Sequence, residues 1–226
     1  MFENLTTAHL ADACLRAGVP VRCAGSSPVL PGQRAAGRAL PCVHVGSVDV
    51  FLEAYESAGP GDVLVVDNGG RRDEACVGDL AVLEARAAGL SGVVIWGLHR
   101  DTADIRAIGL PVFSLGALPT GPQRLDPRPA DGGLVRASLG DFSVTRDDAI
   151  LADDDGVVAV PLDRADELTT LAAAIRDTER RQAELVAGGT TLRDQLRFGD
   201  YLARRRAEPD HTFRDHLRAI GGAIEE

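Results

Sequence analysis

Three short apolar runs in the middle of the chain, each bounded by turn residues, predict buried β-strands. They cover residues 63–66, 92–96 and 111–113. Apolar residues at helical spacing fill the two intervals, so we expect one helix over about 74–88 and another that ends near Ile108. Strands that alternate with helices in this way run parallel, with right-handed crossovers. The pattern therefore predicts a central parallel βαβαβ unit.

The segments before this unit show shorter patterns. Apolar residues near helical spacing predict a first helix over residues 5–17, which stops at Gly18. Residues 19–41 are rich in proline and glycine and show no clear period. A strand over 39–45 and a short helix over 48–57 are expected to follow.

After the central unit the pattern changes to closely spaced strands. Residues 116–133 are dense in proline and glycine, which predicts a long surface connection. The acidic turn at 153–156 resembles a calcium loop only superficially, because the later ligands are missing, so a tight hairpin is expected there. Short apolar stretches predict four strands, over residues 134–139, 142–145, 149–151 and 157–160.

The last part of the chain has a helical pattern. A long amphipathic helix is expected over residues 163–187, ended by the glycine pair at 188–189, and a charged helical tail follows it. A chain of 226 residues with 45% hydrophobic content can bury one good core. We therefore expect a catalytic domain over residues 1–187 and a C-terminal helical extension over 188–226.

The net charge and the cysteine content limit the kinds of binding partner and the cellular compartment that we expect. A net charge of −10 repels phosphate backbones, which argues against nucleic acid. Residues 1–7 lack the basic start and apolar core of a signal peptide, and no apolar run reaches membrane-spanning length. The four cysteines lack paired zinc spacing and are interpreted as small buried residues. We expect a cytoplasmic protein that binds neither nucleic acid nor membrane.

All 24 basic residues are arginine, and this changes the range of possible chemistry. Without a lysine amine, the chain cannot form a Schiff base with a carbonyl substrate or with pyridoxal phosphate. It also lacks the lysine of a P-loop. Schiff-base aldolases, pyridoxal-phosphate enzymes and P-loop NTPases are therefore excluded as they are usually built.

Charged side chains follow the first two strands of the predicted parallel unit. Asp79 lies beyond the first strand, while His99, Arg100 and Asp101 follow the second, with Asp104 on the next helical turn. Ligands bind open parallel sheets at the carboxyl ends of the strands. Carboxylates suit a magnesium-like ion, and a guanidinium can hold a substrate carboxylate through two hydrogen bonds. Metal-assisted enolate chemistry is one interpretation of this group.

A structural interpretation of the same residues stays open. Asp101 and Asp104 can cap a helix, Asp79 can occupy a first turn that favours negative charge, and Arg100 can pair with any of the three. His99 can be an acid or base, or a hydrogen-bonded loop histidine. Spacing alone does not decide between the two interpretations.

These residues carry a family resemblance. Gly78, Asp79 and Leu80 form a triplet, twenty residues separate Asp79 from Arg100, and Asp101 and Asp104 complete an Arg-Asp-x-x-Asp motif. This spacing resembles the signature of the RraA-like family, which includes the 4-hydroxy-4-methyl-2-oxoglutarate/4-carboxy-4-hydroxy-2-oxoadipate aldolases. Residues 60–67 and 153–161 match as well, so the resemblance covers roughly residues 5–185.

The resemblance implies a fold, an assembly and a reaction. The fold is an α/β, αββα-type sandwich of the swivelling β/β/α kind, assembled as a homotrimer or a hexamer with sites between subunits. The reaction is class II aldol cleavage or decarboxylation of a small 2-oxo acid through a pyruvate enolate, with Mg²⁺ or Mn²⁺ as cofactor. Because an iminium cannot form here, a metal and a guanidinium must meet the negative charge that develops on the 2-oxo group.

The resemblance also implies residue roles. Asp101 would ligate the metal, partly through water, and Asp104 would support its water shell. Arg100 would hold the 2-oxo acid and stabilise the enolate, and Asp79 would position a water that carries the proton. Gly78, Asp79 and Leu80 would present backbone amides to the substrate carboxylate, and His99 would be an additional acid or base.

Two departures from the family pattern bear on the substrate. Trp96 precedes Gly97 where the family often has an acidic residue, and the acidic residue that family aldolases borrow from a neighbouring subunit has no identified equivalent here. Two alternatives to the aldolase therefore stay open. One is a protein-binding regulator, because the family's namesake inhibits a ribonuclease by docking. The other is a biosynthetic lyase that acts on a larger 2-oxo acid.

Overall fold

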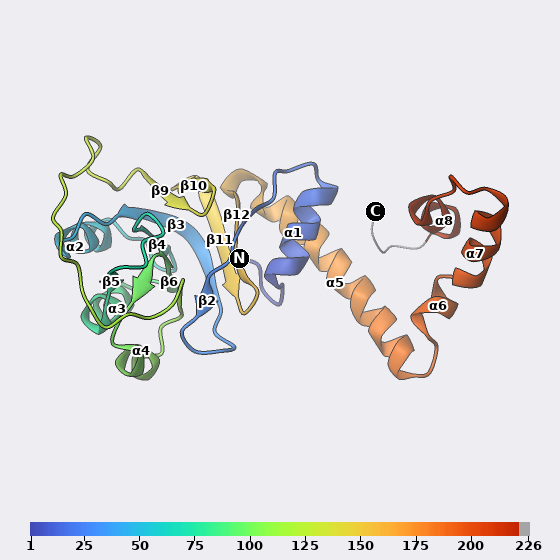
Figure 1. The fold of residues 1–226 in the computed structure, drawn as a ribbon, viewed down its shortest axis with the longest axis horizontal. Helices are drawn as coiled ribbons and strands as arrows, with labels where there is room; N and C mark the ends of the chain where they lie inside the picture. Colours follow the sequence, from blue (N-terminus) through green and yellow to red (C-terminus); the bar gives the residue numbers. More distant parts are fainter. Residues whose placement is uncertain (222–226) are drawn as a thin grey trace. The chain divides into compact units, whose positions relative to one another are not determined.

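The computed structural model describes residues 1–221, and the chain divides into two compact units, Met1–Thr169 and Thr170–Glu226. The first unit is built on an eight-stranded mixed sheet (Figure 1). Its strands are β1 (Arg22–Ala24), β2 (Ser27–Pro28), β3 (Ala35–Val43), β4 (Val63–Asp67), β6 (Gly92–Trp96), β8 (Val112–Ser114), β11 (Asp148–Asp153) and β12 (Gly156–Pro161). They are arranged in the order β1-β12-β11-β3-β4-β6-β8-β2.

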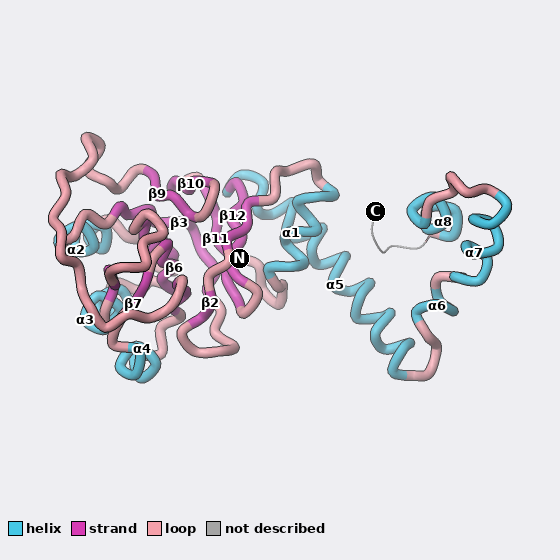
Figure 2. The backbone as a smooth tube through the Cα atoms, viewed as in Figure 1, coloured by secondary structure: helices cyan, strands magenta, loops and turns pink. Residues whose placement is uncertain are grey.

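The centre of the sheet confirms the predicted parallel unit. Strands β3, β4, β6 and β8 are parallel neighbours in that order. Helices α2 (Asp49–Glu56), α3 (Asp79–Ala87) and α4 (Thr102–Ile108) lie on one side of these strands (Figure 2). Their buried residues, among them Phe51, Val82 and Ile105, form one core with the strand residues that face them.

The two edges of the sheet lie close together in the chain. Edge strand β1 ends at Ala24 and the opposite edge strand β2 begins at Ser27, so the sheet must curl until its edges approach each other. A hairpin of β9 (Arg136–Leu139) and β10 (Phe142–Thr145) packs against β3. A second hydrophobic core fills this curled sheet and includes Phe113, Leu139 and Ile150.

Strand β4 explains why the central strands are continuous apolar runs. Val63 and Val65 belong to the core inside the curled sheet, whereas Leu64 and Val66 belong to the core beneath the helices. All four are essentially inaccessible to solvent. A strand that is covered on both faces has no polar alternation, which is the pattern of buried parallel strands.

The structure corrects several predicted boundaries. The helix predicted over residues 74–88 is wrong at its start, because Ala75–Val77 forms strand β5 and the helix begins only at Asp79. Strand β5 pairs in parallel with β7 (Leu98–His99), which lies just after the run predicted as the second strand. This long-range pairing outweighs the local helical pattern. Strands β1 and β2 lie in the Pro/Gly-rich region that shows no period, and they were not predicted.

The acidic turn after β11 is the expected hairpin. Asp153 pairs with Gly156 at the end of the antiparallel strands β11 and β12. Its carboxylate accepts hydrogen bonds from the Thr7 backbone N–H and hydroxyl, at 2.8 and 2.7 Å. These contacts tie the hairpin to the start of helix α1 (Thr7–Arg16), so Asp153 has a structural role.

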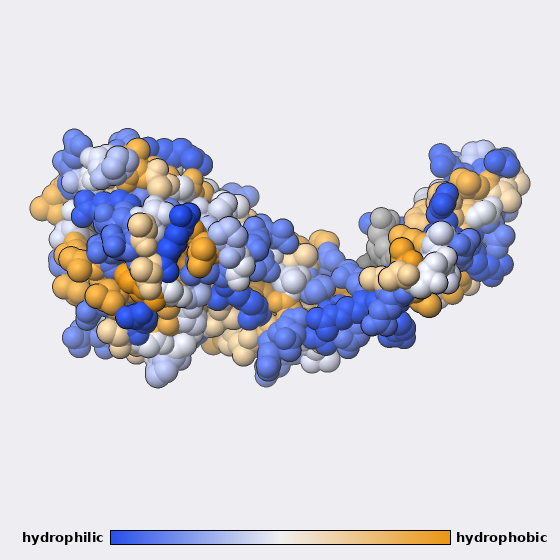
Figure 3. All heavy atoms as spheres, turned by 90° about the horizontal axis from the view of Figure 1, so that it is seen from below, coloured by the Kyte–Doolittle hydropathy of each residue, from blue (hydrophilic) through white to orange (hydrophobic). Residues whose placement is uncertain are grey.

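The second unit is helical, as predicted for residues up to 221; residues 222–226 lie outside the described part of the chain. After a 3-10 turn (Leu162–Arg164), it comprises most of α5 (Ala165–Ala187) together with α6 (Leu192–Gln195), α7 (Phe198–Ala207) and α8 (Phe213–Ile220). The surface along α5 is mainly hydrophilic (Figure 3).

The second unit has a small core of its own. Tyr201 and Phe213 pack edge to face with ring centroids 5.0 Å apart, and the buried His216 bonds through Nε2 to the carbonyl of Leu196 at 2.8 Å. The compact units divide inside α5, whereas the sequence places the division after residue 187, so the extent of a catalytic domain stays a prediction. Within residues 1–221 no helix is long and apolar enough to cross a bilayer.

Candidate active site

The pairing of β5 with β7 brings the two halves of the sequence motif together. Val77 is in register with His99, so the residues that follow, Gly78 and Arg100, become neighbours. The Arg100 N–H donates to the Val77 carbonyl at 3.0 Å. A separation of about twenty residues in the chain thus becomes a direct contact at the carboxyl end of the parallel strands.

Two glycines make room for the Arg100 side chain. A Cβ at Gly121 would lie 2.6 Å from Nη1 of Arg100, and one at Gly78 would lie 3.3 Å from its Nε. Within residues 1–221 the guanidinium forms one ion pair, to Asp101, with Nε and Oδ2 3.4 Å apart. The side chain is 47% exposed. Most of its donors are therefore available to an anionic ligand.

Asp101 has an unusual backbone conformation. It precedes helix α4 with φ 59° and ψ 41°, the left-handed region, and its side chain makes no capping hydrogen bond. Simple helix capping therefore does not account for Asp101, and strained backbone of this kind concentrates at functional sites. Its Oδ2 lies 2.5 Å from the position that a Cβ on Gly78 would occupy. Asp104 lies exposed in the first turn of α4.

A cavity of about 310 Å³ opens beside this contact. Of the predicted site residues, Gly78, Asp79, Leu80 and Arg100 line it, whereas His99, Asp101 and Asp104 do not. Its other lining residues are mostly small or apolar, namely His44, Gly46, Ser47, Val48, Phe51, Ala75, Cys76, Ala81 and Pro122.

The cavity is well suited to a carboxylate. Helix α3 begins at Asp79, and the first residues of a helix have amides without intrahelical partners, which attract anions together with the helix dipole. Asp79, Leu80 and Ala81 all line the cavity, as does Arg100. The Tyr55 hydroxyl donates to the Ala81 carbonyl at 2.9 Å and fixes this turn to α2.

Both ring nitrogens of His99 are already hydrogen-bonded. Nδ1 lies 2.8 Å from the Ser114 hydroxyl and Nε2 lies 3.0 Å from the Thr102 hydroxyl. The residue is 5% exposed, and its burial lowers its pKa below the ordinary value of 6.5. This geometry favours the hydrogen-bonded loop histidine over an acid or base that meets substrate.

Cys76 and Trp96 also make contacts that are typical of structural residues. The Cys76 thiol donates to the Leu98 carbonyl at 3.7 Å, and burial raises the pKa of this thiol to about 12, so it stays protonated at neutral pH. Trp96 packs beside the core inside the curled sheet, and its ring edge approaches Gly70. Neither residue is placed to act as a nucleophile.

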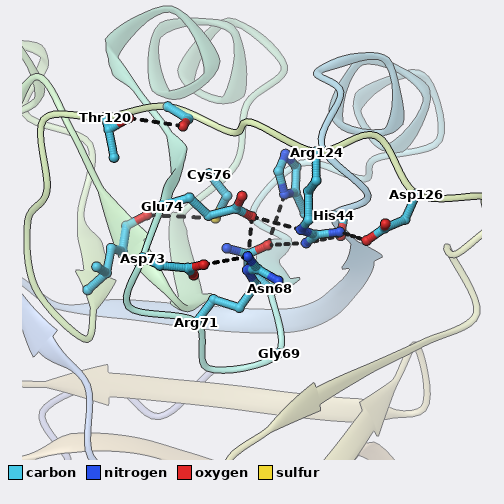
Figure 4. A network of polar contacts seen from close by, with 12 residues as sticks. His44, Asn68, Gly69, Arg71, Asp73, Glu74, Cys76, Thr120, Arg124 and Asp126 are labelled. Atoms are coloured by element: carbon cyan, nitrogen blue, oxygen red, sulfur yellow. Dashed lines mark hydrogen bonds and ion pairs between the residues drawn. The ribbon is translucent and has the colours of Figure 1, made fainter.

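His44 is a cavity residue that the sequence reasoning missed. It follows β3 directly, stacks on Phe51 with ring centroids 5.4 Å apart, and is 3% exposed. Its Nδ1 lies 3.0 Å from Oδ1 of Asn68 (Figure 4). The rule that ligands bind at the carboxyl ends of parallel strands also applies to β3, and that rule could have pointed to His44.

His44 belongs to a buried polar network (Figure 4). Arg124 donates through Nη2 to Oδ1 of Asn68 at 3.0 Å and through Nε to Oε1 of Glu74 at 3.1 Å. Arg71 approaches the same Glu74 oxygen at 3.5 Å. His44, Asn68 and Glu74 are all buried, so the network fixes the orientation of each side chain.

The residues fit a divalent cation only in a water-rich coordination. Within residues 1–221 no group of three or more His, Cys, Asp or Glu side chains converges as a metal site. Asp101 offers one exposed carboxylate that Gly78 leaves unobstructed. Mg²⁺ commonly keeps several waters and binds through one or two carboxylates, so this donor set is compatible with it.

Together these features define a mixed α/β protein with a cavity at the carboxyl ends of its parallel strands, lined by Arg100 and the start of α3. The chain belongs to the RraA-like (Aldolase/RraA) family, whose model matches residues 7–159. The family resemblance drawn from the Gly-Asp-Leu and Arg-Asp motifs is thus confirmed.

Three relatives illustrate the range of this family. The chain is 31% identical to Protein DlpA of Legionella pneumophila over 84% of its own length, but it spans only 31% of that protein. It is 34% identical to a "Putative 4-hydroxy-4-methyl-2-oxoglutarate aldolase" of Aromatoleum aromaticum, over 54% of this chain and 79% of that one. The solved structure of Streptomyces coelicolor RraAS2, described as an unusual member of the RNase ES inhibitor RraA family, matches with TM-score 0.69 and 27% identity, covering 79% and 91%.

Proposed function

We propose that this protein is a divalent-metal-dependent carbon–carbon lyase that cleaves or decarboxylates 2-oxo acids through a pyruvate enolate. The observation that carries the proposal is the convergence of Arg100 and the first amides of α3 on one cavity, with Asp101 beside them. The membership in a family that includes proteins named as aldolases supports it. The absence of lysine from the sequence leaves a metal-assisted route to the enolate.

The substrate carboxylate would bind the amides at the start of α3, near Leu80, while Arg100 holds the 2-oxo group. As the bond breaks, negative charge moves onto the 2-oxo oxygen, and a preorganised guanidinium stabilises that charge without reorganisation. Asp79, at the cavity wall, would orient a water molecule that delivers a proton to the enolate carbon.

Asp101 would hold a Mg²⁺ or Mn²⁺ ion, with Asp104 supporting its water shell. When bound, the ion would supply a Lewis acid for the developing enolate oxygen. Two observations support this assignment: the Asp101 carboxylate makes no capping hydrogen bond, and the missing side chain at Gly78 leaves it room beside its ion pair with Arg100.

We further propose that the cavity lies at an interface of a homotrimer or of a hexamer built from two trimers. Leu80 and Val48 line the cavity yet are 75% and 54% exposed, and apolar residues gather on this end of the first unit, which carries α2 and α3 (Figure 3). Exposed apolar patches commonly mark interaction sites. Light scattering should show trimers or hexamers for the wild-type protein and smaller species for Leu80→Arg. A wild-type monomer would contradict this proposal.

Pyruvate release from oxaloacetate tests the proposed reaction. The wild-type protein with Mg²⁺ should produce pyruvate, EDTA should stop production, and fresh Mn²⁺ should restore it. Asp101→Asn keeps a side chain that tolerates the left-handed region but removes the charge, and should lose about 10²-fold or more of the rate. Full activity of this variant in chelator would contradict the assigned metal role.

The regulator is a second candidate, and the likeness to RraAS2 favours it. A well-folded protein that releases no pyruvate from oxaloacetate or from 4-hydroxy-4-methyl-2-oxoglutarate, with either metal, would support the regulator over the lyase. Slowing of a ribonuclease by the purified chain would then be the direct test.

A further inference from the structure

His44 borders two hollows. Its Nδ1 edge faces Asn68, and His44, Asn68 and Arg124 all line a second, open hollow. The residue also lines the cavity that contains Arg100 and Asp79. Within residues 1–221 the other ring nitrogen, Nε2, has no hydrogen-bond partner, and it is not among the fully buried polar atoms that lack one. Nε2 is therefore the ring nitrogen that stays available to a ligand.

The network fixes which nitrogen carries the proton. A guanidinium can only donate, so the Asn68 atom that Arg124 contacts at 3.0 Å must be the carbonyl oxygen. The same oxygen lies 3.0 Å from Nδ1 of His44 and can only accept, so Nδ1 carries the hydrogen. A neutral ring protonated on Nδ1 has its lone pair on Nε2. His44 is therefore a cavity-lining residue whose Nε2 can accept a proton.

We infer that His44 is a proton-transfer group for the cleavage of 4-hydroxy-2-oxo acids, an inference that rests on the proposed lyase function. Nε2 accepts the proton of the C4 hydroxyl, and the O–H electron pair forms the new carbonyl. The C3–C4 bond breaks, and its electron pair forms the enolate that Arg100 stabilises. The water that Asp79 orients delivers a proton to C3, which completes pyruvate, the C4 fragment leaves as an aldehyde or ketone, and His44 releases its proton to solvent, so atoms and electrons balance.

The charges around the ring suit this task. Burial lowers the pKa of His44 below 6.5, so the base form prevails at neutral pH. Glu74 and Arg124 are the charged groups behind the ring, and Asp79 and Arg100 share its cavity. Glu74 favours the imidazolium and Arg124 opposes it, while the bond to Asn68 strengthens when the ring is charged. The ring can therefore take up a proton and release it again.

Decarboxylation provides an internal comparison, because no hydroxyl proton has to be removed when carbon dioxide leaves oxaloacetate. His44→Asn keeps an N–H donor near the position of Nδ1 and removes Nε2. It should slow cleavage of 4-hydroxy-4-methyl-2-oxoglutarate about 10²-fold or more and change oxaloacetate decarboxylation only a few-fold.

His44→Gln, a second variant without a titrating ring, should show the same difference between the two substrates. His216→Asn replaces a buried histidine of the second unit and should leave the ratio of the two rates unchanged.

The pH profile adds a readout that a purely structural residue would not change. Cleavage by the wild-type protein should decline as the pH falls below about 6.5, and this decline should be missing from the residual activity of His44→Asn. Equal losses on both substrates, or no loss on either, would overturn the assignment. Failure of the wild-type protein on both substrates would instead contradict the proposed function on which the assignment rests.

Nitrogen NMR of the wild-type protein tests the tautomer without any turnover. The signals of His44, identified by their absence from the spectrum of His44→Asn or His44→Gln, should show a proton on Nδ1 and a bare Nε2. Asn68→Leu should weaken this preference, because it removes the oxygen that holds the Nδ1 hydrogen. A wild-type ring protonated on Nε2 would overturn the inference.

Discussion

Two buried histidines at the carboxyl ends of parallel strands, His44 after β3 and His99 in β7, have similar burial but different surroundings. Both have a pKa lowered by burial. His99 uses both ring nitrogens in hydrogen bonds to Ser114 and Thr102, whereas in the described part of the chain, residues 1–221, His44 uses only Nδ1. Burial alone therefore does not identify a histidine as a catalytic acid or base. The distinguishing feature is a ring nitrogen left without a partner at a cavity wall.

Arg100 gives the largest expected effect, because it follows His99 in the chain yet lines the same cavity as His44. Arg100→Ala removes a preorganised cation and should lower kcat/KM for oxaloacetate by about 10²- to 10³-fold or more, with an unchanged unfolding midpoint. Arg86→Ala is the matched control, since Arg86 bonds the Ile108 carbonyl and does not line the cavity. Equal losses of kcat/KM in the two variants would contradict the assignment of the reaction to this cavity.

Gly78→Ala should have a smaller effect that separates geometry from stability. The backbone of Gly78 is extended, with φ −124°, so alanine is tolerated there, but its Cβ would displace the Asp101 carboxylate. We expect a rate loss of about ten- to a hundredfold, measured by pyruvate release, with little change in unfolding free energy. An unaffected rate would mean that the position of Asp101 is unimportant.

His99→Asn should lower the stability of the protein, whereas His44→Asn should lower the cleavage rate. The shorter side chain cannot reach both hydroxyls, and the buried Ser114 hydroxyl loses a partner. The free energy of unfolding should fall by about 1–3 kcal/mol, measured by urea denaturation. A large rate loss at unchanged stability would instead restore His99 as a catalytic residue.

The smallest effect is on the pH dependence of stability. Unfolded histidines titrate near 6.5, whereas buried His44 and His99 resist protonation, so the unfolded chain binds more protons as the pH falls. Stability should therefore be complete well above pH 6.5 and decline as the pH is lowered through this value into the acidic range. Denaturant midpoints measured across this range should show the decline, and they should change less in the double variant His44→Asn/His99→Asn.

The central strands were predictable because burial on both faces leaves an unmistakable apolar run, as in β4. The edge strands β1 and β2 were not, since their pairing partners are far away in the chain and their own sequence carries no period. The residues of strand β5 continue the helical pattern of α3, and only their pairing with β7 shows that they are extended.

The candidate site shows the same division between local and long-range information. The fixed spacing of Asp79 and Arg100 identified the two cavity residues that matter most to the proposed chemistry. His99 belongs to the predicted site only through its position in the chain, next to Arg100. His44 was missed because its significance depends on Asn68 and Arg124, which come from two other segments of the chain.

The central claim is that one cavity binds a 2-oxo acid beside a divalent cation. A crystal structure of the wild-type protein with Mn²⁺ and oxalate, a mimic of the pyruvate enolate, tests it most directly. The account predicts oxalate between Arg100 and the first amides of α3, with the anomalous signal of Mn²⁺ next to the Asp101 carboxylate. Oxalate and Mn²⁺ bound elsewhere, with this cavity left to water, would contradict it.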